Sequence, residues 1–524
     1  LQQILHENRH TAFGLDHGFA DLSDYDAFQR QVPIQDYEGH RPYVDQIATG
    51  RLDALTQEPP FMLGSTSGTT NQPKWVPITQ SWQAKMAGLL RFWIARTSWS
   101  HPRMFNHKTL TVVSPAVEEK APSGMPVGSI SGVTNRRAPW VIRRMYAVPY
   151  EVATLGSYHL RYFMLMRFSL QNSLSCIVTP NPSTLLQLAQ LLEAQAKTLI
   201  AALHSGKLGI DPQDYSEEDQ KILAGLVNHL RPLPKRARKL GEILKDKGRL
   251  LPRDCWPQLA FIGCWLGGSA GVHARQLRSL YGDVGLRDLG FRATEGTFTV
   301  PLEDDSAAGV LALDAHVYEF IPEAEITAEN PTVLRAHELE IGQQYYLLIT
   351  TRAGLYRYDI NDVVEVTGTY RQAPIVRFLR KGRDMVNMVG EKLHVNQLLA
   401  AAHRARQDTG LQWRQFQVLP DAEASCYHLL LESEDAQLTK ADLDAFSQAF
   451  DAALMDENPE YPTKRQSQRL GAPRWIHMKA GWSDRERQRA VEAGKRDVQF
   501  KWPYILEGWR PDLDDEVLGR ANHT

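Results

Sequence analysis

Residues 65–74 hold the densest group of side chains that could bind phosphate. The run reads Ser65-Thr66-Ser67-Gly68-Thr69-Thr70-Asn71-Gln72-Pro73-Lys74. Its hydroxyls are neutral hydrogen-bond donors, Gly68 lets the backbone approach an anion without a Cβ, and Lys74 adds a mobile positive charge. The run lacks the Gly-Lys-Ser/Thr ending of a P-loop, which disfavours a kinase-like or GTPase-like enzyme. We therefore predict that residues 65–74 bind nucleotide phosphates; an ordinary polar loop is the alternative.

A second candidate for ligand contact is the glycine turn Gly267-Gly268-Ser269-Ala270-Gly271. It follows an apolar run of strand character at 258–265 and precedes a stretch of helical character at 272–280. Folds of the α/β class place ligands at such turns between a strand and a helix. A further short strand at 287–291 leads into Ala293-Thr294-Glu295-Gly296.

The elements that must position these turns alternate along the chain. Apolar runs of strand length at 110–113 and 175–179 predict α/β layers with a largely covered sheet. The second run leads into a predicted helix that reaches about residue 203, with Ser183 as its N-cap.

Residues 345–351, 355–359 and 363–367 have the pattern of an antiparallel meander, with Ala353-Gly354 at one turn. This meander predicts a small barrel or sheet in a separate layer.

A domain boundary is predicted near the charged segment Lys381-Gly382-Arg383-Asp384. Residues 1–380 would form a large N-terminal α/β domain, and residues 381–524 a smaller, mobile α+β lid of ordinary domain size. Within the lid we predict paired strands at 416–420 and 426–432, a helix at 440–455 after Thr439, and a strand at 475–478.

Composition and charge narrow the class of protein. The chain has 524 residues, enough for two or three domains, with 43% hydrophobic residues, 23% charged residues and a formal net charge of −2. The lack of a basic excess makes nucleic acid an unexpected partner. The most apolar stretch, 185–203, is interrupted by charged and amide residues and reads as an amphipathic helix, so no membrane contact is expected.

The four cysteines, Cys176, Cys255, Cys264 and Cys426, form no CxxC pair or zinc spacing, which predicts buried thiols in a reducing cytoplasm. No signal peptide is visible, and because the sequence starts at Leu1 we expect it to begin inside a longer chain. The oligomeric state is left open.

Taken in order, three segments resemble the signatures of adenylate-forming enzymes, and most closely the GH3 acyl-acid-amido synthetases. Residues 66–74 resemble the phosphate loop of that superfamily, Phe291-Arg292-Ala293-Thr294-Glu295 its aromatic-to-Glu motif, and Tyr356-Arg357-Tyr358-Asp359-Ile360-Asn361-Asp362 the GH3 motif that ends in Gly-Asp. Trp265-Leu266-Gly267-Gly268-Ser269-Ala270 and Arg41-Pro42-Tyr43-Val44-Asp45 are also similar to GH3 sequences. The resemblance covers most of the chain.

This resemblance implies a ligase that uses ATP and Mg²⁺. A carboxylic acid would attack the α-phosphate of ATP to give an acyl-adenylate, and an amine, expected to be an amino acid, would then displace AMP. Such catalysis depends on positioning and on neutralising phosphate charge. A thiol ligase that makes an acyl-CoA or carrier-protein thioester, and a nucleotide-binding protein without turnover, are the alternatives.

The resemblance also assigns roles to residues. Glu295 is the expected ligand of Mg²⁺, which prefers oxygen donors; a charge at a helix N-terminus is its alternative. Phe291 would lie over adenine, unless it is a core residue. Asp362 would accept hydrogen bonds from the ribose hydroxyls, unless it is a turn residue. The other expected nucleotide contacts are Ser65, Thr66, Ser67, Gly68, Thr69, Thr70, Lys74, Gly268, Ser269, Ala293 and Thr294, of which Thr69 is expected to be catalytic.

The segment around Arg383 and Lys392 resembles the hinge of the superfamily, and the tail Gln499-Phe500-Lys501-Trp502-Pro503 resembles that of GH3 proteins. Lys501 is the expected catalytic contact to pyrophosphate, while Arg383 and Lys392 are expected nucleotide contacts. Asn71 and Asn361 stand where the related sequences have Gly. Because Asn tolerates a positive φ better than other residues, both loops are expected to keep their shape.

Overall fold

The computed structural model describes residues 1–66, 74–267, 270–326, 328–382, 385–386, 388, 391, 393–421, 423–433, 438–458, 461–467, 469–492, 500, 502–506 and 508–521. These residues form two compact units, Leu1–Leu379 and Arg380–Thr524. The mixed α/β class predicted from the sequence is confirmed. Each unit is described by itself.

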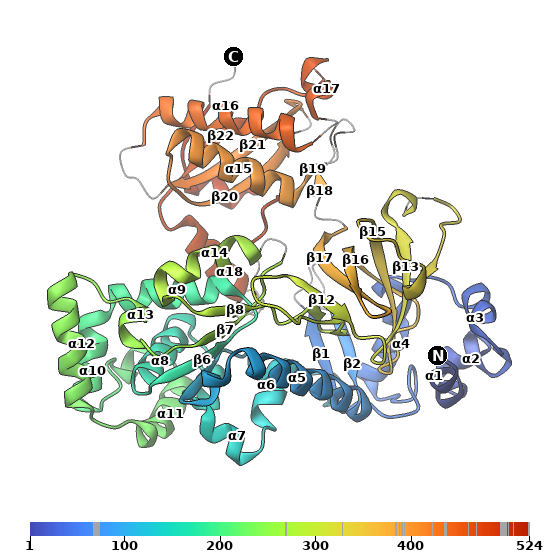
Figure 1. Ribbon diagram of the computed structural model, residues 1–524, viewed down its shortest axis with the longest axis horizontal. Helices are drawn as coiled ribbons and strands as arrows, with labels where there is room; N and C mark the ends of the chain where they lie inside the picture. Colours follow the sequence, from blue (N-terminus) through green and yellow to red (C-terminus); the bar gives the residue numbers. More distant parts are fainter. Residues whose placement is uncertain are drawn as a thin grey trace. The chain divides into compact units, whose positions relative to one another are not determined.

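A parallel sheet lies at the centre of one half of the first unit (Figure 1). Its strands have the order β3-β6-β7-β8, and every neighbouring pair is parallel. The strands are β3 (Lys108–Thr111), β6 (Leu174–Val178), β7 (Phe261–Gly263) and β8 (Gly285–Arg287). The predicted strand at 258–265 contains β7 but is longer than it. The predicted strand at 287–291 is wrong in placement, because β8 ends at Arg287 and shares only that residue with it.

Helices cover both faces of this sheet. Figure 1 shows α9 (Pro182–Ala194) and α14 (Ala270–Tyr281) on one side and α5 (Gln80–Ser100) on the other. Trp93 of α5 packs against Cys176 and Phe261 of the sheet. Around them lie α6 (Ile130–Arg136), α7 (Trp140–Met145), α8 (Tyr158–Leu170), α10 (Ala196–Ser205), α11 (Glu217–Leu226), α12 (Pro234–Lys247) and α13 (Pro252–Cys255).

The predicted helix to residue 203 needs two corrections. Asn181, not Ser183, is the N-cap, and its side chain accepts the backbone N–H of Ser183. Pro182 then occupies the first helical position, where its missing N–H costs nothing. The helix also divides at Gln195, so that α9 and α10 are separate.

A seven-stranded sheet forms the second layer of this unit, in the order β11-β12-β17-β16-β15-β13-β14. Its strands are β11 (Thr299–Val300), β12 (Ala308–Leu311), β13 (Val317–Pro322), β14 (Leu334–Arg335), β15 (Gln344–Thr350), β16 (Tyr358–Tyr370) and β17 (Ala373–Lys381). The antiparallel pair β15–β16 confirms the predicted turn at Ala353-Gly354, but the predicted strands at 355–359 and 363–367 belong to one strand, β16, and the third strand of the meander is β17, which was not predicted. The predicted strand at 355–359 is wrong in extent, because β16 begins only at Tyr358 and continues without a break to Tyr370.

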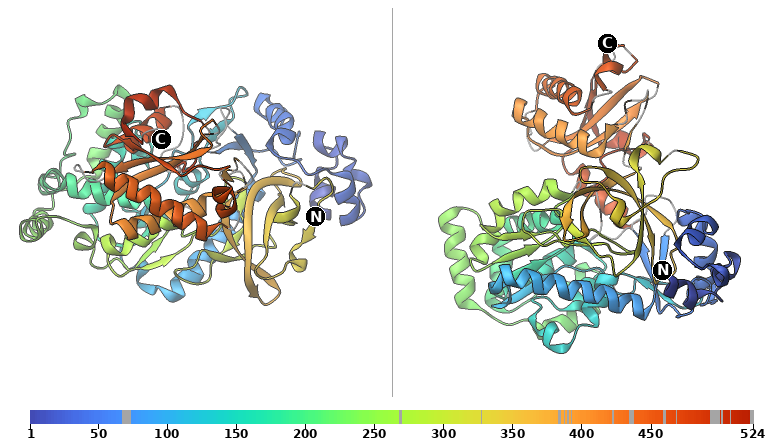
Figure 2. Two further views of the ribbon diagram at one scale, coloured as in Figure 1. Left: turned by 90° about the horizontal axis from the view of Figure 1, so that it is seen from above. Right: turned by 45° about the vertical axis from the view of Figure 1, so that its right-hand side comes forward.

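A smaller sheet with the order β2-β1-β5-β4 carries the predicted phosphate loop. Its strands are β1 (Met62–Thr66), β2 (Lys74–Ile78), β4 (Glu119–Lys120) and β5 (Pro126–Gly128). The N-terminal helices lie beside the seven-stranded sheet (Figure 2), and Gln35 pairs with Tyr358 at the start of β16. These helices are α1 (Gln2–Asn8), α2 (Ala12–Asp16), α3 (Tyr25–Gln31) and α4 (Tyr37–Thr49).

The second unit contains a four-stranded sheet in the order β20-β21-β22-β23. Its strands are β20 (Trp413–Asp421), β21 (Cys426–Ser433), β22 (Arg474–Met478) and β23 (Val517–Arg520). The helices of this unit are α15 (Val395–Thr409), α16 (Lys440–Glu457), α17 (Tyr461–Gln466) and α18 (Trp482–Glu492). Separately, β18 (Met385–Val386) pairs with β19 (Leu393–His394). The predicted pairing of the strands at 416–420 and 426–432 is confirmed by β20 and β21, which are antiparallel. The predicted start of the helix after Thr439 is also confirmed, because the Thr439 side chain caps α16 by accepting the N–H of Asp442.

All four cysteines are free thiols and buried, as predicted. Over the described ranges, every helix is too short or too polar to cross a membrane.

Candidate active site

A β-hairpin holds the predicted phosphate loop. β1 and β2 pair antiparallel, with Thr66 opposite Lys74, so residues 67–73 connect two adjacent strand ends. Ser65 and Lys74 therefore lie at the base of the loop. Ser67, Gly68, Thr69 and Thr70, like Asn71, lie outside the described residues.

Tyr37 of α4 fixes the start of β2. Its hydroxyl donates to the carbonyl of Trp75 at 3.0 Å and accepts the N–H of the same residue at 2.7 Å. The Lys74 ammonium lies 5.4 Å from the centroid of the Tyr37 ring, within reach of a cation–π interaction. Burial raises the pKa of Tyr37 to about 12, so the phenol stays protonated and keeps its donor role.

Thr294 and Glu295 form the turn of a short hairpin that packs on β1. β9 (Arg292–Ala293) pairs antiparallel with β10 (Gly296–Thr297), which leaves only these two residues in the turn. The Thr294 hydroxyl donates to the carbonyl of Ser65 at 3.4 Å. The indole N–H of Trp82, on α5, donates to the Glu295 carbonyl at 3.2 Å. The Thr294–Glu295 turn is thus held against the base of the phosphate loop.

The Glu295 carboxylate faces the third motif. Glu295 is 7% exposed, and its Oε1 accepts the hydroxyl of Tyr358 at 3.4 Å. Burial and the nearby Glu295 charge raise the pKa of Tyr358 well above its usual value, so this hydroxyl remains a donor. His40 packs edge-on against Tyr358, with ring centroids 5.5 Å apart. All three motif segments therefore meet through Ser65, Thr294–Glu295 and Tyr358.

A bulge in β16 carries Asp362. The pairing with β15 shifts register between Tyr346 and Leu348, opposite the stretch that contains Asn361. Asn361 has a φ of 57°, and its N–H donates to Asp359 Oδ1 at 2.7 Å. This confirms the expectation that Asn361 takes the left-handed conformation in place of Gly. Bulges re-aim the side chains next to them, and Asp362, 2% exposed, directly follows this one.

Arg357 and Glu319 anchor this strand, and neither was expected from the sequence. Arg357 Nε donates to both carboxylate oxygens of Glu319, at 3.1 and 3.0 Å. Its Nη1 donates to the carbonyls of Gln29 and Val32, both at 2.8 Å. The sequence did contain a signal for this ion pair, because Glu319 is a carboxylate in the middle of an apolar strand. A charge buried in such a strand needs a partner of opposite charge.

Asp288 organises the glycine turn and was also missed. It follows β8 directly, and its carboxylate accepts the N–H of Leu266 and the N–H of Gly290, both at 2.6 Å. Burial raises the pKa of Asp288 to about 7 in spite of these donors. An acidic residue at the end of an apolar strand was the signal that could have revealed it. Gly268 and Ser269 lie outside the described residues.

Phe291 lies in the hydrophobic core rather than on an open surface. It is 8% exposed, and its ring centroid is 4.8 Å from that of Phe298 and 5.2 Å from that of Phe378. Ala293 packs against the same cluster. Such packing is typical of the core alternative for Phe291, and an adenine contact stays a prediction.

The remaining expected contacts lie outside the described residues, namely Arg383, Lys392 and Lys501. The described residues include no group of three or more His, Cys, Asp or Glu side chains placed to hold a metal ion. A nucleotide-borne Mg²⁺ does not require one, because it keeps waters and binds one or two carboxylates besides the phosphates. The buried carboxylate of Glu295 has the chemistry of such a ligand.

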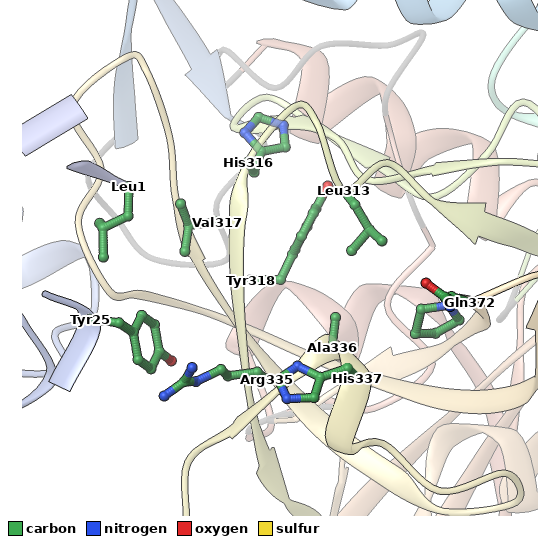
Figure 3. A pocket seen from close by; sticks show the side chains of 11 residues that line it. Leu1, Tyr25, Leu313, His316, Val317, Tyr318, Arg335, Ala336, His337 and Gln372 are labelled. Carbon is green, nitrogen blue, oxygen red and sulfur yellow. The ribbon is translucent and has the colours of Figure 1, made fainter. Parts of the chain in front are cut away.

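A cavity of about 380 Å³ lies at the edge of the seven-stranded sheet, and residues of β13 and β14 line it. Figure 3 shows Tyr25, His316, Tyr318 and Arg335 around it. An ideal Cβ on Gly296 would come within 2.5 Å of His316 Nε2, so His316 packs directly beneath the hairpin. Burial lowers the pKa of His316 to about 4, which leaves its ring neutral.

Comparison with family models identifies three regions. The GH3 family N-terminal domain matches residues 1–286, the GH3 family central domain residues 309–381, and the GH3 family C-terminal domain residues 396–508.

Among characterised relatives, indole-3-acetic acid-amido synthetase GH3.3 of Arabidopsis thaliana is 22% identical over 422 residues, which is 77% of this chain and 70% of that protein. The 4-substituted benzoates-glutamate ligase GH3.12 of the same plant is 22% identical over 499 residues, 89% of this chain and 84% of that protein.

Two solved structures share the fold. That of the GH3.15 acyl acid amido synthetase superposes with a TM-score of 0.85 at 19% identity, covering 99% of this chain and 93% of the other. A 2-hydroxyisobutyryl-CoA ligase in the postadenylation state gives 0.54 at 13% identity, covering 97% and 87%. At these identities the likeness establishes the architecture alone.

Proposed function

Because the chain belongs to the GH3 family, we propose that it is an ATP-dependent acyl-acid-amido synthetase. The observation that carries this proposal is the meeting of three distant segments: Thr294 bonds to Ser65, and Tyr358 bonds to Glu295 in the same turn. These two bonds support the proposal that the predicted phosphate loop, the Glu295 carboxylate and the segment that carries Asp362 form one site.

The proposed reaction has two steps. A carboxylate oxygen attacks the α-phosphorus of ATP, the bond from that phosphorus to the bridging oxygen breaks, and pyrophosphate leaves. An amine nitrogen, expected from an amino acid, then attacks the acyl carbon and loses a proton while AMP departs. The first step needs phosphate charge neutralised and the acid held in line with the leaving group.

Roles follow from the chemistry of each group. Residues 65–74, with Thr69 and Lys74, would bind the phosphates, and the Asp362 carboxylate would accept the ribose hydroxyls. Glu295 would hold Mg²⁺, which when bound neutralises phosphate charge; Tyr358 would keep that carboxylate oriented. Lys501 would contact pyrophosphate during adenylation, with Arg383 and Lys392 as nucleotide contacts.

The test measures pyrophosphate release from ATP and Mg²⁺ with a panel of carboxylic acids, each with pooled amino acids, with CoA, or with neither. Release that depends on an acid, together with amide formation from the amino-acid pool, is the expected result. Consumption of the adenylate by CoA alone would identify a thiol ligase instead. Measurable ATP binding without release for any acid would contradict turnover.

A further inference from the structure

Arg292 is a partly buried cation, and the charge that acts on it is that of Asp288. Its Nε is buried with no hydrogen-bond partner, and within the part of the chain that the structure describes it donates no hydrogen bond and forms no ion pair. Burial lowers the pKa of its guanidinium to about 10, which still leaves it charged at neutral pH. A buried charge without a direct partner costs stability, so a ligand is the natural partner to seek.

The position of Arg292 on β9 sets the direction of its side chain. Phe291 belongs to the hydrophobic core cluster, and Ala293 packs against it. Because successive side chains of a strand point to opposite faces, Arg292 points away from that cluster. Its charge acts on Asp288, the residue that holds the turn after β7. Arg292 therefore lies toward the carboxyl ends of β7 and β8, where α/β proteins bind ligands.

Three anionic groups of the substrates could contact Arg292: the phosphates of ATP, the reacting carboxylate of the acid, and a second acidic group on the same acid. The first two are unfavourable. The phosphates belong with the Thr294–Glu295 turn, which bonds to Ser65 at the base of the predicted phosphate loop, whereas the charge of Arg292 acts on Asp288. The reacting carboxylate loses its negative charge on becoming an acyl phosphate, so a strong bond to it would stabilise the substrate rather than the transition state. A second acidic group on the same substrate keeps its charge throughout.

We propose that Arg292 binds a second anionic group of the acid substrate, so that the site selects acids carrying a carboxylate beyond the one that reacts. This inference rests on the proposed function and deepens it by naming the substrate class. The planar guanidinium suits such a carboxylate because it can donate two parallel hydrogen bonds. Arg292 is then a specificity-determining residue.

The test compares matched acids in the full-length protein: glutarate with pentanoate, adipate with hexanoate, and isophthalate with benzoate. Binding is measured by calorimetry without ATP, and adenylation by ATP–pyrophosphate exchange. The wild-type protein should prefer the diacid of at least one pair by tenfold or more in both assays. Arg292→Met should lower that ratio at least tenfold, and Arg292→Lys should lie between. Arg238→Met, on the exposed face of α12, should leave the ratio unchanged.

The outcomes separate this inference from the proposed function. Diacid binding that requires Arg292, without pyrophosphate exchange, would keep the inference and overturn the synthetase. ATP–pyrophosphate exchange with the same preference for the diacid in wild type and in Arg292→Met would keep the synthetase and overturn the inference. A higher KM for ATP that is the same with both acids of a pair would assign Arg292 to a phosphate and overturn the inference, as would failure of every diacid to bind. Arg292→Met should also keep or raise the Tm, because it removes a buried charge; a lower Tm with an unchanged ratio would show a structural ion pair instead.

Discussion

Gly64→Ala tests whether the contact between β1 and the Thr294–Glu295 turn controls catalysis. A Cβ at position 64 would lie 2.7 Å from Thr294 Cγ2, whereas ordinary contacts begin at 3.4 Å. The turn or the strand must therefore move by about 0.7 Å, and overpacking of this kind costs roughly 1–3 kcal/mol of stability. Since a displacement of about 1 Å can cost a hundredfold in rate, we expect adenylation to fall at least about tenfold.

A second substitution makes this prediction specific. Thr294→Ser removes Cγ2 but keeps the hydroxyl that donates to Ser65, and the next atom near the new Cβ is then Ile78 Cδ1 at 3.5 Å. The double variant Gly64→Ala/Thr294→Ser should regain most of the activity and Tm.

The assay is ATP–pyrophosphate exchange with an acid that supports it, together with thermal unfolding. Gly368→Ala is the matched control, because Gly368 also lies in a strand and an added Cβ meets no atom within 4 Å among the described residues. Equal activity and Tm in Gly64→Ala and Gly368→Ala would refute the reasoning, as would a double variant no better than Gly64→Ala.

Glu295→Gln should keep most of the affinity for ATP but lower pyrophosphate release at least about tenfold, because the neutral amide is a poor Mg²⁺ ligand; unchanged release would remove the metal assignment. Asp362→Ala should weaken ATP binding, measured by calorimetry, by about 1–3 kcal/mol if the carboxylate bonds to the ribose; an unaltered Kd would argue for a turn residue. Lys501→Ala should slow adenylation more than amide formation from supplied acyl-adenylate, and equal slowing of both steps would indicate a structural lysine. Burial lowers the pKa of His40 from 6.5 to about 4. Between these pH values the unfolded state therefore binds one proton more than the folded state. The contribution of His40 to the free energy of unfolding, ~3 kcal/mol, is complete above pH 6.5 and is lost as the pH falls through 4. Urea unfolding should therefore show a smaller loss between pH 7 and 4.5 in His40→Gln than in wild type, and identical losses would contradict a neutral buried His40.

Local signals predicted the local parts of this fold. The apolar run at 175–179 became β6, and Thr439 caps α16 because its hydroxyl is three residues from the N–H of Asp442. Asn361 took the left-handed conformation because few other residues tolerate it. Each of these outcomes depends on neighbours in the sequence.

The larger errors arose where distant residues decide, whereas the error at the N-cap of α9 was local. The strand predicted from residue 355 starts at Tyr358 because Arg357 has a φ of 43° while it forms a buried ion pair with Glu319. Asn181 and Ser183 are equally good caps by residue type, and the Pro between them decides for Asn181. Asp288 belongs to no motif, and Arg292 lies inside the aromatic-to-Glu motif at a position to which the resemblance gave no role. The importance of both depends on burial and on the turn after another strand.

The bonds from Arg357 to the N-terminal carbonyls also affect how the protein is made. Val32 and Arg357 are 325 residues apart in the chain. At about 5–20 residues per second, a ribosome adds Arg357 roughly 15–65 s after Val32. The core of the N-terminal helices includes Tyr356 as well. Residues 1–40 therefore leave the ribosome long before the residues that complete their packing exist, and β16 and the N-terminal helices α1–α4 must reach their final structure together, late in synthesis.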